Sequence, residues 1–253
     1  MKRFRRPPLP SRTAKDLARN QRKTDTERMA GTLDVAKTWK SARRTKTLAR
    51  VLAVLHRMAG ARQRCMYCGD SHGTDIDHFW PKRRYPERMF SWPNHLLSCT
   101  ECGRHKGDRF PVSEGAPLLV DPTAEDPWRF LDFDPKTGNV TARFDPTRDV
   151  WFPKGQATVD LLRLDRREAL SAGRLKSYRR LVSWVSDAIA SGASQDRPDP
   201  STSLLSDDDH GLLGWCFLGL GREVEPFATL RIRHPDIWHR CLDAIASQFA
   251  DRE

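Results

Sequence analysis

Residues 65–110 read CMYCGDSHGTDIDHFWPKRRYPERMFSWPNHLLSCTECGRHKGDRF and contain the residues that decide the fold. Two C-x-x-C pairs frame this stretch, Cys65 with Cys68 and Cys99 with Cys102, and 30 residues lie between them. Each pair offers two thiolates on a tight turn, and together they supply the four soft ligands of a tetrahedral zinc site. Because four cysteines leave no open coordination position, the predicted zinc is structural and not catalytic.

The segment between the two pairs predicts structure of its own. Residues 74–78 are expected to form a short strand that Pro81 ends. Adjacent residues on a strand point to opposite faces, so Asp77 can bind a metal while His78 addresses a water molecule. A helix is expected to start at Gly103, after the second cysteine pair.

These residues resemble the HNH nuclease family over about 45 positions. The pattern is C-x-x-C, D-H-x-x-P-K and N-x-L-L-x-C-x-x-C-x-x-x-K-G. The resemblance implies two strands and a helix around one divalent cation, Mg²⁺ or Mn²⁺. It implies that Asp77 binds this cation, that His78 is the general base and that Asn94 braces the loop bearing the histidine. The four cysteines match the family's zinc knuckles.

One position departs from the family pattern. Gly103 follows the last cysteine, where the family usually has an Asn or His as the second ligand of the catalytic metal. His105 is the nearest substitute, although two residues on a regular helix correspond to a rotation of about 200°. Asp75 and Asp108 are the other candidates. A weakened or inactive nuclease remains an open alternative at this point.

The distribution of charge points to a polyanionic partner. The net charge is +11, and residues 1–64 alone carry 19 Lys or Arg against 4 Asp or Glu. A basic block beside a metal site favours nucleic acid, although a solvated basic tail would give the same composition. The residues expected to contact DNA phosphates are Arg43, Arg44, Lys46, Lys82, Arg83, Arg84, Arg104 and Lys106. Phosphate contacts position a duplex without reading its sequence, so little intrinsic sequence specificity is expected.

The flanking regions are predicted to be mainly helical. Residues 1–12 form an extended arm because of their prolines. Residues 13–28 form a helix with Thr13 as N-cap, and residues 34–58 form one longer helix. Residues 134–138 form a hairpin turn, and residues 191–210 form a loop or linker. Further helices are expected at residues 156–190 and 236–249, with Cys216 and Cys241 as core side chains.

The expected fold is therefore mainly α with a small α+β insert, in three parts. Residues 1–64 form the basic arm and helices, residues 65–112 the HNH-type motif with its structural zinc, and residues 113–253 a Pro-rich connector and a helical C-terminal region. The sequence contains no apolar run of about 18 residues and no signal peptide, so a cytoplasmic protein without a membrane segment is expected.

Segments outside the motif are similar to the HNH subunit of Septu- and retron-type antiphage systems. They include Arg109 to Pro111, Pro117 to Pro122 and Ala157 to Asp165. This resemblance implies an effector endonuclease that cuts DNA, and an ABC- or SMC-like ATPase as partner. The alternative is a zinc-stabilised DNA-binding or scaffold subunit with weak or no nuclease activity.

Overall fold

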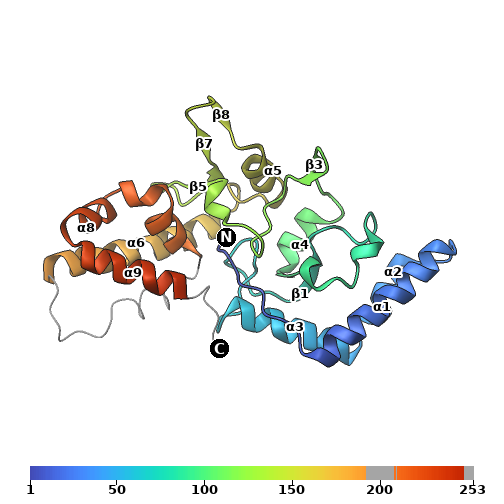
Figure 1. Cartoon of the computed structure of the whole chain (residues 1–253). Coiled ribbons are helices and arrows are strands. Elements are labelled where there is room, and N and C mark those ends of the chain that lie inside the picture. The colour runs from blue at the N-terminus through green and yellow to red at the C-terminus, as the bar shows by residue number, and fades with distance from the viewer. Residues whose placement is uncertain (192–207, 209, 248–253) are drawn as a thin grey trace. The chain divides into compact units, whose positions relative to one another are not determined.

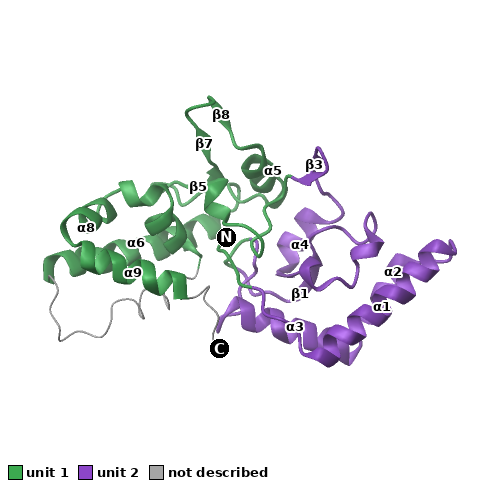
Figure 2. Cartoon of the chain, in the orientation of Figure 1, with its two compact units in different colours: residues 1–5, 68–70, 118–253 green, residues 6–67, 71–117 purple. Residues whose placement is uncertain are grey.

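The structure, a computed structural model, describes residues 1–191, 208 and 210–247. In this part of the chain, helices predominate and four small two-stranded antiparallel sheets occur (Figure 1). The chain divides into two compact units (Figure 2). Unit 1 comprises Met1–Arg5, Cys68–Asp70 and Leu118–Glu253, and unit 2 comprises Arg6–Tyr67 and Ser71–Pro117. The mainly helical fold class is thereby confirmed.

Unit 2 begins with α1, Ser11–Met29, after an extended segment that includes three prolines. The predicted helix is confirmed, but the N-cap is Pro10 and not Thr13. Thr13 lies inside the first turn and is 1% exposed, because the N-cap is three residues earlier than the sequence suggests. Gln21 on α1 donates a hydrogen bond to the Pro86 carbonyl and accepts one from the Phe90 amide. Helix α1 therefore holds the loop that contains Met89.

The single helix predicted for residues 34–58 is wrong, because the structure has two. They are α2, Val35–Ala42, and α3, Lys46–Ala59. Asp34 caps α2 by accepting a hydrogen bond from the Lys37 amide. Thr45 has extended dihedral angles and caps α3 through the Leu48 amide. A threonine is a good N-cap, so the break occurs where a side chain can satisfy the free amides of the second helix.

Two strands and one helix follow in unit 2. Strand β1, Asp75–His78, pairs antiparallel with β2, His95–Ser98, with His78 opposite His95 and Asp77 opposite Leu96. Helix α4, Thr100–Lys106, begins earlier than the predicted Gly103 because Cys99 acts as its N-cap. Gly107 ends it with φ of +51°. The remaining elements of unit 2 are η1 Pro86–Arg88, η2 Trp92–Asn94, β3 Val112–Ser113 and β4 Ala116–Pro117.

Unit 1 contains the predicted hairpin turn. Residues 134–138 join β5, Leu131–Phe133, to β6, Val140–Ala142, which pair antiparallel. A second hairpin is formed by β7, Phe144–Asp145, and β8, Val150–Trp151. Phe144 and Trp151 face each other across it, with ring centroids 5.1 Å apart, and Trp151 is 51% exposed. Because the sheet is only two residues long on each side, both aromatic rings remain at the surface of the unit.

The helices of unit 1 pack around a core that includes both remaining cysteines. The helical patterning predicted for residues 156–190 is confirmed and forms two helices, α5 Pro153–Leu162 and α6 Glu168–Ser191, because Arg163 adopts a left-handed conformation that ends α5. The last predicted helix is α9, Pro235–Ser247, and its predicted continuation to residue 249 lies outside the described residues. Cys216 and Cys241 are buried, as predicted. The other elements are η3 Pro127–Arg129, η4 Gly214–Leu218, η5 Leu220–Glu223 and α8 Phe227–Arg233.

Most of the linker predicted for residues 191–210 lies outside the described residues. Within the described part of the chain, no helix has both the length and the apolar character needed to cross a membrane.

Candidate functional site

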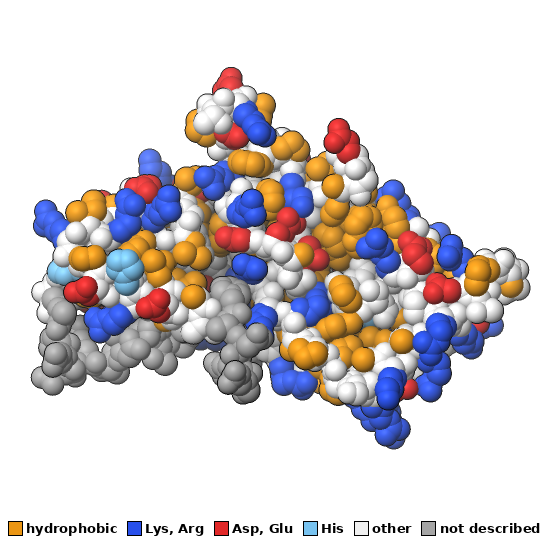
Figure 3. Space-filling model, viewed as in Figure 1, with side chains coloured by type: hydrophobic (Ala, Val, Ile, Leu, Met, Phe, Trp, Pro, Cys, Tyr) orange, Lys and Arg blue, Asp and Glu red, His pale blue; other side chains and the backbone are white. Residues whose placement is uncertain are grey.

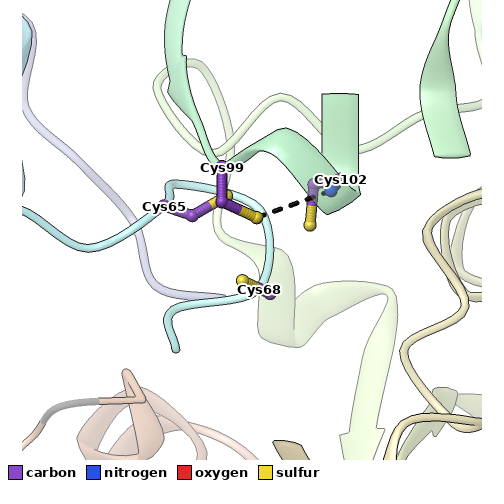
Figure 4. Close-up of side chains that lie close together, drawn as sticks. All are labelled: Cys65, Cys68, Cys99 and Cys102. Carbon is purple, nitrogen blue, oxygen red and sulfur yellow. Dashed lines mark hydrogen bonds between the residues drawn. The ribbon is translucent and has the colours of Figure 1, made fainter. Parts of the chain in front are cut away.

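The four predicted zinc ligands come together in the structure. The Sγ atoms of Cys65, Cys68, Cys99 and Cys102 all lie within 4.8 Å of one another, and all four residues are buried (Figure 4). Zn–S bonds of about 2.3 Å in a tetrahedron correspond to S–S separations of about 3.8 Å, so this cluster matches a metal site in size. The cluster can hold a metal ion such as zinc, as the two C-x-x-C pairs predict.

Local backbone structure explains why the cysteines meet. The Met66 amide donates to the Leu97 carbonyl and the Cys65 amide to the Ser71 carbonyl, which fix the first cysteine pair against β2. At the second pair, Cys99 Sγ accepts a hydrogen bond from the Cys102 amide at 3.4 Å, where α4 begins (Figure 4). A helix N-terminus presents free amides, which favour the thiolate form that a metal requires.

Asp77 and His78 point to opposite faces of β1, as strand geometry predicts. Asp77 Oδ2 accepts a hydrogen bond from the Tyr67 hydroxyl at 2.7 Å and lies 3.1 Å from Lys106 Nζ. No hydrogen bond from a described residue reaches its other oxygen, Oδ1. The His78 imidazole has other neighbours, in which Trp39 and His95 are the nearest rings.

The His78 imidazole is held in one tautomer. Its Nε2 atom lies 3.0 Å from the Met89 carbonyl oxygen, which can only accept a hydrogen bond. Nε2 must therefore carry the proton, and Nδ1 keeps the lone pair that could accept one. Burial lowers the pKa of His78 well below its ordinary value, and the nearby His95 and Lys82 lower it further. The ring is consequently neutral at neutral pH.

His95 shares the same carbonyl group. Its Nε2 donates to the Met89 oxygen at 2.9 Å, and its ring lies 5.2 Å from the His78 ring in an edge arrangement. Complete burial is the main reason that the pKa of His95 falls to about 4. One carbonyl thus orients two neutral imidazoles, and the loop that supplies it is held by Gln21 of α1.

Asn94 holds the same loop from the other side. Its amide nitrogen donates to the carbonyl oxygens of Trp80 and Arg88, and its Oδ1 accepts a hydrogen bond from the Trp80 amide at 2.7 Å. The side chain is buried at 3% exposure. These three bonds span the segment between β1 and β2, which is where a brace of the histidine-bearing loop has to act.

The candidates for a second metal ligand each have a different partner. His105 Nε2 lies 3.7 Å from Glu101, on its own helix. Asp75 pairs with Arg43 at 3.1 Å and Asp108 with Arg83 at 3.3 Å. Among the described residues, the four cysteines form the one group of three or more His, Cys, Asp or Glu side chains that could hold a metal. Asp77 therefore has no second candidate metal ligand beside it among the described residues.

Lys106 has a role that its sequence position did not reveal. The sequence suggests a phosphate contact, but the side chain is completely buried. Its ammonium group donates to the His78 carbonyl at 2.5 Å and pairs with Asp77. Lys106 therefore links the last turn of α4 to the Asp77 carboxylate and to the His78 backbone carbonyl. Tyr67, Met89 and Trp39 were also missed, since their contacts with the pair depend on tertiary packing.

The other predicted phosphate contacts lie at or near the surface of unit 2. Lys82 is partly buried, whereas the rest are exposed: Arg43, Arg44, Lys46, Arg83, Arg84 and Arg104. Arg43 and Arg83 take part in exposed ion pairs, and Arg84 donates to the Phe110 carbonyl. Basic side chains gather around α1 and α3 in the face shown in Figure 3. Among these side chains, Lys82 lies close enough to interact electrostatically with both Asp77 and His78.

The chain is similar to a known protein over part of its length. No family model matches it. It is 28% identical over 120 residues to the Septu protein PtuB of Bacillus thuringiensis. The matched part covers 46% of this chain and 42% of that protein, so the chain spans less than half the length of this relative. This distant similarity confirms the predicted resemblance to a Septu-system protein, and membership of the HNH family stays a prediction.

Proposed function

We propose that the chain is an HNH-type endonuclease that hydrolyses DNA phosphodiester bonds with little intrinsic sequence specificity. In this proposal it acts as the effector of an antiphage defence system, in keeping with its similarity to a Septu protein. The observation that carries the proposal is the arrangement of Asp77 and His78. They occupy opposite faces of one strand, and the Met89 carbonyl leaves His78 with an unprotonated Nδ1.

The chemistry that these residues offer is general base catalysis. His78 Nδ1 takes a proton from water, which then attacks phosphorus, and the neutral ring is the form in which it can do so. The low pKa favours the unprotonated form but weakens the base. Lys106 holds Asp77 and the His78 carbonyl in register, so it positions both groups without contacting the surface.

A divalent cation fits one atom of this site. Asp77 Oδ2 is engaged by Tyr67 and Lys106, which leaves Oδ1 for a metal. Mg²⁺ is often bound by one or two carboxylates, with phosphate and water as its remaining ligands. When bound, Mg²⁺ or Mn²⁺ would stabilise charge on the scissile phosphate and on the departing oxygen. Gly103 gives no second ligand, so weak metal binding is expected.

In this proposal the four cysteines hold a structural zinc. Their place at the start of α4 and beside β2 means that the ion would fix the two elements that carry Lys106 and pair with β1. The zinc would thus support the site without contacting the scissile phosphate.

The test is plasmid cleavage with Mg²⁺ or Mn²⁺ by the wild type and by His78→Ala. We expect the variant to lose cleavage by about 10²–10⁴-fold, the usual contribution of a general base. His239→Ala is the matched control, because His239 is an exposed histidine of α9. Normal cleavage by a folded His78→Ala protein would refute the mechanism.

A second candidate function is a zinc-stabilised DNA-binding or scaffold subunit without catalysis. Gly103 and the ion pairs of Asp75 and Asp108 favour it, because among the candidate ligands in the described residues they leave only the Oδ1 atom of Asp77 to bind a cation. The same cleavage assay separates the two functions: a wild type that binds DNA but does not cut it under any metal supports the second. In either case an ABC- or SMC-like ATPase is the proposed partner, by resemblance to Septu-type systems.

A further inference from the structure

Helix α2 lies over the proposed catalytic base. The Trp39 ring stands edge-on to the His78 ring, with centroids 4.3 Å apart and an interplanar angle of 75°. The same indole approaches Phe90 at 5.9 Å and His95 at 6.0 Å. His78 is 3% exposed, and the Trp39 indole is one of the groups that cover its ring, together with His95. A general base must reach a water molecule, so the described arrangement keeps His78 from doing so.

The rest of α2 is only lightly attached to unit 2. The helix has eight residues and buries two of them, Trp39 and Ala42. Before it, Gly31 has φ of +69° in an exposed turn, and after it a short turn leads to Thr45. Few buried side chains and a turn at each end are features of an element that opens locally.

A groove beside α2 also indicates that this helix is only lightly attached to unit 2. It has a volume of about 490 Å³ and is lined by side chains of α1 and α2, together with Phe90. On this side α2 faces an open groove with a largely polar lining and not packed protein, so few packing contacts oppose its movement. The indole of Trp39 is thus the main buried contact that keeps the helix in place.

We propose that α2 is a cover that Trp39 fastens over His78, and that the wild type cleaves DNA only during the fraction of time in which α2 is open. The inference rests on the proposed function for its catalytic meaning, because it assigns regulation to the same site. The cover itself is a structural property that can be measured without any cleavage. Removal of Trp39 exposes the imidazole to solvent and raises cleavage by the otherwise intact protein.

The experiment measures modification of His78 by diethyl pyrocarbonate, which reacts with accessible neutral imidazoles, by peptide mass spectrometry. We expect the reaction of His78 to be about tenfold faster in Trp39→Ala than in the wild type, since a locally closed site reacts only when it opens. Trp151→Ala is the matched control, because it removes an indole from the β7–β8 hairpin. His239, which is exposed, should react equally in all three proteins.

Plasmid cleavage by the same proteins separates the two proposals. Faster modification with faster cleavage supports both. Faster modification with no cleavage by any protein keeps the cover and rejects the nuclease. Unchanged modification in folded Trp39→Ala overturns the cover, and so does faster modification accompanied by slower cleavage than wild type, because Trp39 would then position the base.

A second measurement does not depend on the variant being folded. Amide hydrogen exchange of the wild type should be at least about tenfold faster in α2 than in the middle of α3, because α2 opens without unfolding the unit. Trp39→Phe, which keeps an aromatic ring, should fall between the wild type and Trp39→Ala in His78 modification. Exchange in α2 as slow as in α3 would overturn the cover even if Trp39→Ala cannot be purified.

Discussion

At the scale of single residues, Gly103 is the position where a small change should have the largest effect. A Cβ atom built there would meet only Ser98 Oγ at 3.8 Å, which is ordinary van der Waals contact. Its backbone is helical within α4, so a residue with a Cβ atom can stand there without backbone strain. Gly103 is thus a natural place to supply the second metal ligand that the resemblance to HNH nucleases implies.

We predict that Gly103→Asn lowers the Mn²⁺ concentration needed for half-maximal cleavage by about tenfold, because a second-ligand contact contributes of the order of 1.4 kcal/mol. Gly103→Ala is the control: it should stabilise α4 by about 0.5–1 kcal/mol through helix propensity and leave the metal dependence unchanged. A metal titration of cleavage checks this. The same half-maximal concentration for Asn and Ala would show that position 103 does not face the cation.

The buried ion pair of Asp77 and Lys106 gives the second prediction. Asp77→Ala leaves the Lys106 ammonium, which is 1% exposed, with no counter-charge and should destabilise the protein by about 3–5 kcal/mol. Asp77→Ala with Lys106→Met should recover most of this loss, since both charges are gone. Chemical denaturation measures the free energies. Asp75→Asn, at an exposed pair, should change stability by less than about 0.5 kcal/mol. Equal losses in the single and double variants would contradict the coupling.

At the scale of secondary-structure elements, the start of α3 and the turn before it carry a basic cluster: Arg43, Arg44, Lys46 and Arg50. All four side chains are exposed. We predict that replacing these four with glutamine weakens DNA binding and lowers the slope of log affinity against log salt by about 0.9 for each phosphate that is no longer neutralised. The readout is anisotropy of a labelled duplex at several salt concentrations.

The control for that experiment is a set of basic residues from unit 1. Arg222, Arg233 and Arg240 are exposed and lie far from the described site in sequence. Glutamine at these positions should leave the salt slope unchanged. A wild-type slope in the α3 variant would identify the basic block as a solvated face, the alternative that the sequence left open.

The elements also show which parts of the sequence were informative. The strand at residues 74–78, ended by Pro81, and the hairpin turn at 134–138 were predicted from local residue types, and the structure has the strand at Asp75–His78 and the turn at 134–138. The single helix predicted at 34–58 was wrong because apolar periodicity continues across Thr45, and the helical patterning predicted at 156–190 is confirmed as two helices separated at Arg163. A cap or one left-handed residue breaks a helix without breaking its apolar stripe.

The candidate site was predictable where local spacing determines it, and not where it depends on tertiary packing. The four cysteines meet because their spacing fixes them on two turns, which is local information. The neighbours of His78, by contrast, come from α2 and from the loop at Met89, so no spacing rule could find them. Lys106 matched the family pattern, but its burial depends on how α4 packs on β1.

At the scale of the whole molecule, the cysteine cluster joins residues that are far apart in the sequence. We predict about one zinc ion per chain, lost in Cys99→Ser, together with a fall in melting temperature. Loss of a structural zinc removes binding energy that contributes directly to folding. Metal analysis and thermal melts measure both quantities. Cys216→Ser is the control, since Cys216 is a buried cysteine that does not belong to the cluster. Unchanged zinc content in Cys99→Ser would remove the basis for the site.

The β7–β8 hairpin contains an exposed indole whose fluorescence can report the binding of a partner. Trp151 is half-exposed at 51%, whereas the other tryptophans of the described chain are buried or only partly accessible. An indole in water emits at longer wavelength than one in an apolar setting. Any partner that covers this hairpin will therefore shift the emission to the blue, and Trp151→Phe will abolish that shift. A complex that forms with no change in emission leaves the hairpin open to solvent.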